Sequence, residues 1–185
     1  MTKLDLDKYG LSYLKNKNPV TWTDSEVDKL IDAFTKEDIA PLVLIPFTPL
    51  NVEHLLRESH CRRCGKCCLS NPDDLGVMVS EDELRTIAKH SKYTYKYLKR
   101  HSTKYEHPER DDLRHLPQPC MFYRQGQCTI YRWRPFVCRI YPISNSPRGG
   151  KVYTTISLRC DYGKDLYRSL LKYQKEKAQT QLLDI

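Results

Sequence analysis

Eight cysteines are the residues of this chain best suited to chemistry. Four fall within eight positions, in the run CRRCGKCC, and four more follow at wider intervals. They are Cys61, Cys64, Cys67, Cys68, Cys120, Cys128, Cys138 and Cys160. Thiols this close together are either joined in disulfides or bound to a soft metal, because free exposed thiols are readily oxidised. The spacing therefore indicates a disulfide framework or a thiolate metal site.

The start of the chain bears on the choice between disulfides and metal. Disulfide-rich small domains are typical of secreted proteins, which begin with a basic region followed by an apolar segment. The first residues, MTKLDLDKYGLSYLKNKN, lack that pattern. The longest apolar stretch, 42–47, is far shorter than the about 20 residues that cross a bilayer. We therefore expect a soluble cytoplasmic protein whose cysteines bind metal rather than one another.

The spacing also suggests how the cysteines are shared between sites. Two-residue spacing lets a tight turn point both sulfurs at one metal, as Cys61, Cys64 and Cys67 could do. Cys68 directly follows Cys67, and adjacent side chains diverge on a helix or a strand, so we expect Cys68 to serve a second site. Two four-cysteine sites result. An iron-sulfur cluster, of the 4Fe-4S type, is the favoured cofactor and Zn²⁺ the alternative, since both accept four cysteines.

The formal net charge of +8 belongs to the cysteine-bearing part of the chain. Residues 1–60 carry 7 Lys/Arg against 10 Asp/Glu, and the remaining residues carry 24 against 13. Basic residues beside cysteines can offset thiolate charge, and these are Arg62, Arg63, Lys66, Arg139 and Arg159. We favour that role over a nucleic-acid surface made by Arg132, Arg134, Arg139 and the C-terminal lysines. The expected partner is another protein, and no membrane contact is expected.

Helical periodicity places two helices before the cysteines. The segment Thr23-Asp24-Ser25-Glu26 has the spacing of a capping box, which predicts a helix over about 24–37. Thr48-Pro49 offers a second helix start that leads toward the cysteine run. The prolines at 41, 46 and 49 argue against a long regular element between the two helices.

Short elements joined by turns are expected from the first cysteines onward. They are a strand at 77–79, helices at 81–90 and up to about 101, a loop over 101–119, two short extended segments around a turn within 120–131, a short helix from Pro135, a strand at 152–158 and a helix after Asp161. Ser80 to Glu83 repeats the capping-box spacing at the start of the helix over 81–90. The tyrosines of the run YTYKY, in the next helix, are expected to pack. The sequence thus predicts an α+β fold: a small, loop-rich single domain organised by cysteine-bound metal. Its parts are a helical segment 1–58, the metal-binding domain 59–163 and a basic helix 164–185.

The cysteine pattern resembles a known family. CRRCGKCC, followed by PCMFYRQGQCTIYRWRPFVCRIYP and a last cysteine in SLRC, is similar to the YkgJ-type cysteine-cluster family, the zinc- or iron-chelating CxxCxxCC domain. The resemblance covers about residues 59–163 and fills all eight cysteine positions. It implies a metal or iron-sulfur centre held by those eight residues. Our leading hypothesis is a cytoplasmic iron-sulfur or zinc protein with a structural, electron-transfer or maturation role.

Two other functions stay open. A flagellin lysine methylase is similar across this domain, so the resemblance allows a protein-modifying enzyme such as a lysine methyltransferase. The chain contains no GxGxxG motif that would cradle an ordinary nucleotide-type cofactor, and no catalytic residue is identified. The second alternative is a zinc-dependent module that binds nucleic acid.

Overall fold

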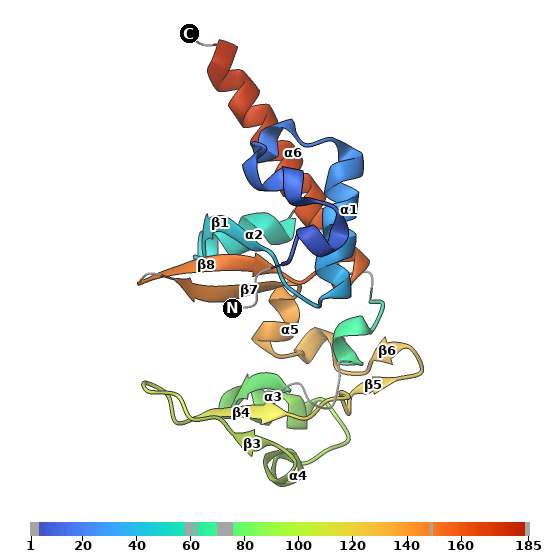
Figure 1. Ribbon diagram of the computed structural model, residues 1–185. Helices are drawn as coiled ribbons and strands as arrows, with labels where there is room; N and C mark the ends of the chain where they lie inside the picture. Colours follow the sequence, from blue (N-terminus) through green and yellow to red (C-terminus); the bar gives the residue numbers. More distant parts are fainter. Residues whose placement is uncertain (1–3, 58–60, 62, 70–75, 149, 184–185) are drawn as a thin grey trace. The chain divides into compact units, whose positions relative to one another are not determined.

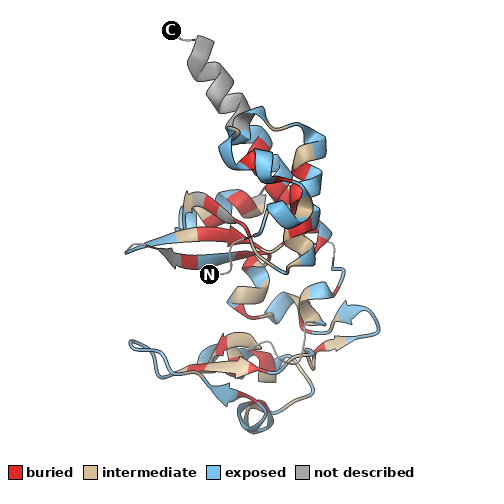
Figure 2. Ribbon diagram, in the orientation of Figure 1, coloured by how far each residue is buried: buried red, intermediate tan, exposed pale blue. Residues whose placement is uncertain are grey.

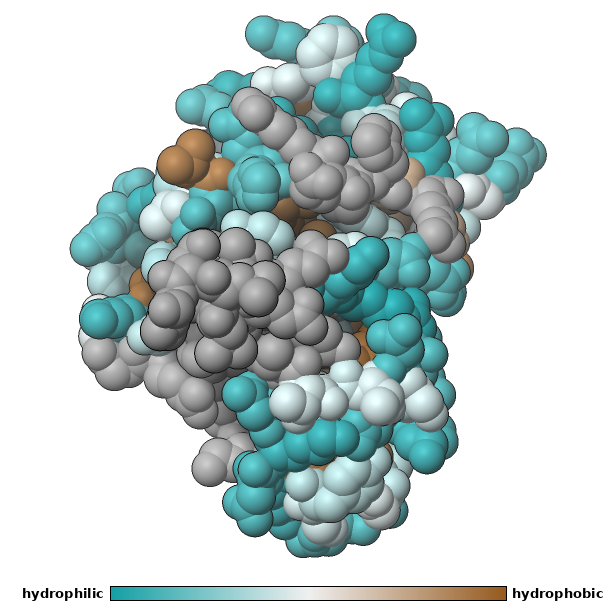
Figure 3. All heavy atoms as spheres, turned by 90° about the horizontal axis from the view of Figure 1, so that it is seen from above, coloured by the Kyte–Doolittle hydropathy of each residue, from teal (hydrophilic) through white to brown (hydrophobic). Residues whose placement is uncertain are grey.

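The computed structural model describes residues 4–57, 61, 63–69, 76–148 and 150–183 (Figure 1). Helices and small antiparallel sheets make up these residues, which confirms the predicted α+β class. Within the described ranges, no helix combines the length and the apolar character needed to span a bilayer. Among the described residues on the face seen in Figure 3, hydrophilic side chains dominate and hydrophobic ones show only in small areas.

Two compact units make up the chain. One unit is Met1–Arg62 together with Pro142–Ile185, and the other is Arg63–Tyr141. This grouping differs from the three segments proposed from the sequence. The reason is strand pairing, because residues that follow Pro142 pair with a strand of the N-terminal segment. Cys61 and Cys160 consequently belong to the first unit and the other six cysteines to the second.

The first unit contains an antiparallel sheet in the order β1-β8-β7. Its strands are β1 (Leu42–Pro46), β7 (Ile143–Arg148) and β8 (Lys151–Ile156). The strand predicted at 152–158 is present as β8, whose last three residues are buried (Figure 2). The prolines between the two helices predict that no long regular element forms there, and the strand β1 is five residues long. β1 forms at an edge of the sheet, where proline is tolerated, and its register shifts between Val43 and Pro46.

Helices complete the first unit and match the predicted ones closely. They are α1 (Asp24–Lys36), α2 (Pro49–Arg57) and α6 (Asp161–Leu183), with 3-10 turns η1 (Asp7–Tyr9), η2 (Ser12–Asn16) and η3 (Pro19–Thr21). The capping box is real: Thr23 Oγ1 accepts from the Glu26 N–H, and Glu26 Oε2 accepts from the Thr23 N–H. Side by side in Figure 1, α1 and α6 are joined by the Arg168–Asp28 ion pair at 2.9 Å.

The second unit is built on a sheet in the order β2-β4-β3. Its strands are β2 (Val77–Ser80), β3 (Thr103–Lys104) and β4 (Leu113–Leu116), and its helices are α3 (Glu81–Lys89), α4 (Tyr95–Arg100) and α5 (Phe136–Ile140). The predicted loop over 101–119 is therefore wrong in part. β3 and β4 form there because Leu113 and Leu116 are buried, and two apolar residues suffice to anchor a strand this short.

Short turns carry most of the second unit's cysteines. The two-stranded pair β5 (Tyr123–Arg124) and β6 (Gln127–Cys128) confirms the predicted extended segments around a turn. The 3-10 turns are η4 (Lys66–Cys68) and η5 (Tyr131–Trp133). Cys120 and Cys128 border a buried core of Val79, Leu84, Ile87, Leu98, Leu116, Phe122 and Ile130. The core thus gives these thiols a fixed apolar backing.

Glu83 joins two of these helices. Its Oε2 accepts from the Ser80 N–H at 3.0 Å, and Ser80 Oγ accepts from the Glu83 N–H, which completes the predicted capping box of α3. Its Oε1 accepts from the Phe136 N–H at 2.6 Å. Phe136 is the first residue of α5, which carries Cys138. One carboxylate therefore satisfies the starts of α3 and α5 together.

We predict that the first unit loses stability at acid pH because Glu26 becomes protonated. The hydrogen bond from Lys17, at 2.7 Å, and then the Thr23 N–H lower the pKa of Glu26 from 4.5 to about 2. A pKa that is lower in the folded state stabilises fully above the unfolded value, and that stability is lost as pH falls from about 4.5 to about 2. Unfolding measured by denaturant across this range should show the loss. Glu26→Gln should flatten the dependence, whereas Asp32→Asn, at an exposed position of the same helix, should leave it intact; equal slopes in all three proteins would contradict the assignment.

We predict that Glu83→Ala destabilises the second unit by about 1–2 kcal/mol, because it removes an N-cap partner and leaves the Phe136 N–H without its acceptor. Hydrogen exchange at the Phe136 amide should accelerate in this variant. Asp82→Ala is the matched control, since it removes an exposed carboxylate from the same helical turn. Unchanged exchange at Phe136 in Glu83→Ala would rule out the link between the two helices.

Candidate metal centre

Five of the eight cysteines form one group in the second unit. η4 carries Cys67 and Cys68, the segment before β5 carries Cys120, β6 ends at Cys128, and α5 contains Cys138. Each of these thiols is within electrostatic range of others in the group. All five are partly buried, and no disulfide joins any of the eight cysteines, which all lie among the described residues. The group therefore brings together thiols from three separate stretches of the sequence.

Three sulfurs at the centre of the group are in direct contact. The Sγ atoms of Cys67 and Cys68 are 4.0 Å apart, and the Cys68 thiol also hydrogen-bonds with Cys120. A backbone hydrogen bond from the Cys120 N–H to the Cys68 carbonyl, at 2.8 Å, holds the two segments together. Gln118, two residues before Cys120, also contacts this turn: its Nε2 donates to the Cys67 carbonyl at 3.3 Å. The sequence predicted that Cys67 and Cys68 diverge; here the tight turn η4 brings their sulfurs together instead.

Hydrogen bonds shift the pKa values of these three thiols in different directions. The hydrogen bonds with the Cys68 thiol are the main cause that lowers the pKa of Cys67 and that of Cys120 to about 7 each. The same bonds raise the pKa of Cys68, because ionising it would break them and place a third negative charge in the group. The thiolate form is therefore favoured at Cys67 and Cys120 and disfavoured at Cys68.

Burial and charge act differently on the two remaining thiols. Loss of solvent raises the pKa of Cys128 and, more strongly, that of Cys138, and the charges of Cys67 and Cys120 add to both effects. Arg134 opposes them, since its positive charge favours the thiolate form. Its guanidinium carbon lies 3.9 Å from the centroid of the Tyr131 ring, a contact that fixes the cation beside the thiols.

Gly65 shapes the turn that presents Cys67 and Cys68. Its φ of 75° lies in the left-handed region, and it is the N-cap of η4. A β-carbon added there would lie 2.1 Å from Tyr123 Oη, so this position has no room for a side chain. The glycine within CRRCGKCC was not singled out from the sequence, although its place inside a tight cysteine run is the available signal. The bond from the Phe136 N–H to Glu83 and the role of Gln118 were also missed, since both depend on partners about 50 residues apart in the sequence.

The other three cysteines stand apart from this description. Cys64 belongs to the second unit and its side chain is exposed. In the first unit, Cys61 is partly buried and Cys160 is buried, with its Sγ accepting from the Gly163 N–H at 3.4 Å. The structure thus brings together Cys67, Cys68, Cys120, Cys128 and Cys138, while ligand roles for Cys61, Cys64 and Cys160 stay predictions.

The donors of the group suit a soft cation. Thiolates select zinc and iron-sulfur centres, and both bind the deprotonated sulfur. Two sulfurs on one tetrahedral zinc lie roughly 3.8 Å apart, close to the Cys67–Cys68 separation of 4.0 Å. Among the described residues, no three His, Cys, Asp or Glu side chains already surround a single ion position. We therefore expect the thiols to move inward when metal binds.

Comparison with known proteins gives the same answer. The profile of one family, described as "CxxCxxCC: Putative zinc- or iron-chelating domain", matches residues 60–161, which include all eight cysteines. The "Uncharacterized protein MJ0661" of Methanocaldococcus jannaschii is 27% identical over 101 residues, or 54% of this chain and 52% of that protein. The chain thus spans about half the length of this curated relative. No solved structure matches. Because the family profile covers more than half of the chain, this protein belongs to the family of zinc- or iron-chelating CxxCxxCC domains.

Proposed function

We propose that this protein holds an iron-sulfur cluster in its cysteine group and works in the cytoplasm as an electron-transfer or cluster-maturation protein. The single observation that supports a thiolate-bound centre most strongly is the contact among Cys67, Cys68 and Cys120, with Cys128 and Cys138 in range. Four thiolates are needed for a four-iron cluster, and this group offers five. When bound, the cluster would supply one-electron redox chemistry.

The residues around the thiols suit a charged centre. Four thiolates with an oxidised four-iron cluster carry a net charge of about −2, and a buried charge of that size needs nearby compensation. Arg134 provides it, since its cation acts on Cys67, Cys128 and Cys138. Partial exposure of all five thiols supports exchange of electrons with a protein partner rather than full enclosure. Zinc is the alternative occupant, and it would give the same sulfurs a structural role.

We predict that anaerobically purified protein is brown and contains iron and acid-labile sulfide in matching amounts. Metal analysis should be combined with the visible spectrum on one sample, because zinc can replace iron during aerobic expression. Colourless protein that contains zinc and no sulfide, even when produced with abundant iron under anaerobic conditions, would contradict the iron-sulfur cluster and support a structural zinc site.

We predict that Cys120→Ser lowers metal affinity by at least about 100-fold, because it removes a ligand and not merely a residue that orients one. The melting temperature of metal-loaded protein should fall with it. Met121→Leu is the matched control: it removes the neighbouring sulfur but no thiolate, and both residues pack against the same core. Because four thiols of the group remain in Cys120→Ser, Cys68→Ser is combined with Cys120→Ser in a second variant. Full metal content in that double variant would show that the group described above is not the metal site, whichever metal is bound.

A further inference from the structure

Three aromatic rings stack in a row along the start and end of α4. Tyr93 and Tyr97 have ring centroids 4.9 Å apart with planes 11° apart, and Tyr97 and His101 are 3.9 Å apart at 21°. The residues are four apart in sequence, so the helix places them one above another. Thr94 caps this helix through the Tyr97 N–H, which holds the spacing at its start. The row is therefore a consequence of helical geometry.

One end of the row is anchored and the other is open. Tyr93 packs edge-on against the buried Phe122 at 5.8 Å, and its hydroxyl accepts from Arg124 at 3.1 Å. At the other end, His101 is exposed, and its Nδ1 lies 2.9 Å from the Tyr97 carbonyl, which orients the ring. Among the described residues, no other ring packs on His101 apart from Tyr97. An oriented, exposed ring face thus ends a stack rooted in the core.

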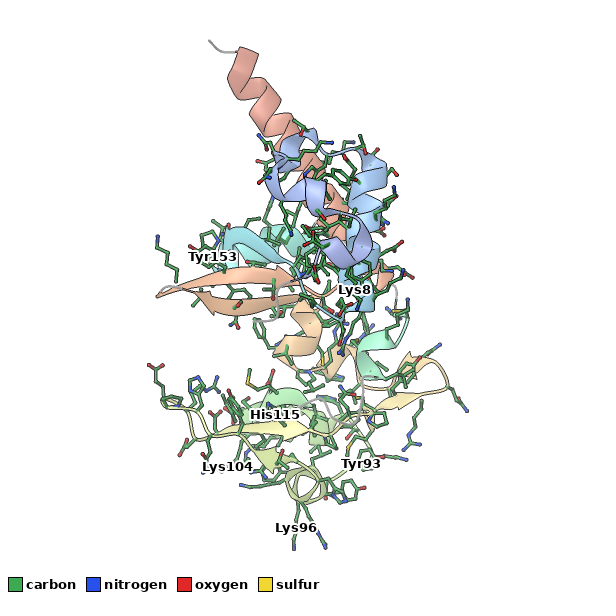
Figure 4. All side chains as sticks on the ribbon, viewed as in Figure 1. Lys8, Tyr93, Lys96, Lys104, His115 and Tyr153 are labelled. Atoms are coloured by element: carbon green, nitrogen blue, oxygen red, sulfur yellow. The ribbon has the colours of Figure 1, made fainter. Side chains whose placement is uncertain are left out.

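The segment around the stack is strongly basic. Residues 84–105 contain seven Lys/Arg and no Asp or Glu. Lys92, Lys96 and Arg100 each precede a ring of the stack by one residue, and all three side chains are exposed. Lys96 extends outward from α4 (Figure 4). Within the described part of the chain, Lys96 and Arg100 form no ion pair, whereas Lys99 is paired with Glu81 at 2.6 Å.

We propose that this α4 surface, formed by Lys92, Tyr93, Lys96, Tyr97, Arg100 and His101, binds single-stranded nucleic acid. A base would extend the ring stack on His101, and the basic side chains would contact the phosphates. Proteins that bind single strands combine these two features, an aromatic platform for bases and cations along the backbone. An acidic protein could pair with the basic side chains, but it has no base that would stack on the exposed face of His101. The aromatic row therefore favours nucleic acid as the partner.

This surface differs from the one that the sequence alone suggested. That surface involved Arg132, Arg134 and Arg139, and Arg134 acts on the thiols of the metal centre instead. The sequence predicts that the tyrosines in and just before α4 are packing residues. Tyr93 does pack on the core, but Tyr97 keeps 40% of its surface exposed. The proposal is independent of which metal occupies the cysteine group.

The test is fluorescence anisotropy of the full-length, metal-loaded protein with labelled single strands of about 12 nucleotides, as poly-dT and as poly-U. We expect binding that weakens as salt rises. Lys96→Ala with Arg100→Ala should weaken it about tenfold and reduce the slope of log affinity against log salt by about 1.4, since each phosphate contact contributes about 0.7. His101→Ala should also weaken binding, about tenfold, but leave the slope unchanged because stacking releases no counterion.

Two controls make the result decisive. Lys29→Ala with Lys151→Ala removes the same charge from exposed positions of the first unit and should change affinity less than twofold. Poly-glutamate of similar length tests the acidic-protein alternative. No binding of either strand at low salt would overturn the proposal. So would equal losses in the α4 variants and the control, or poly-glutamate binding as tight as that of the strands and insensitive to His101→Ala.

Discussion

Repulsion between neighbouring thiolates is the constraint on which the second unit depends. Cys67, Cys68 and Cys120 lie close together, and hydrogen bonds with the other two thiols and burial raise the pKa of Cys68, which disfavours a third negative charge in the group. A bound cation relieves the same repulsion more completely, since it attracts every sulfur at once. A cation therefore favours the gathering of thiols at a place where an apolar core would otherwise use aliphatic side chains.

Fixed connections between distant segments keep this group assembled. The backbone bond from Cys120 to Cys68 and the contact from Gln118 to Cys67 both bridge about 50 residues of sequence. Glu83 does the same for α5, whose start it holds against α3. Closing loops of that length costs conformational entropy, which a small unit can recover only through several such connections or through metal binding. The polar bonds and the thiols thus serve one purpose, to hold few residues in a defined arrangement.

Sequence reasoning succeeded where the signal is local. Both capping boxes, at Thr23 and at Ser80, start helices where the pattern placed them, because cap and partner lie three residues apart. It failed where tertiary pairing decides: β4 forms within a charged stretch that was expected to be a loop, because two leucines reach the core. The spacing singled out the eight cysteines, five of which the structure brings into one group, but the approach of Cys67 to Cys68 depends on turn geometry that spacing does not encode.

Gly65 has a consequence for how the cysteine run can be used elsewhere. Its missing side chain leaves the volume that Tyr123 occupies, and Tyr123 belongs to a strand almost 60 positions later. The run CRRCGKCC is consequently not expected to keep its turn geometry outside this fold. Grafted into an unrelated scaffold, it would carry the sulfurs but lose the aromatic wall that gives the turn its shape, so engineers of metalloproteins would have to transplant the β5–β6 ribbon with it.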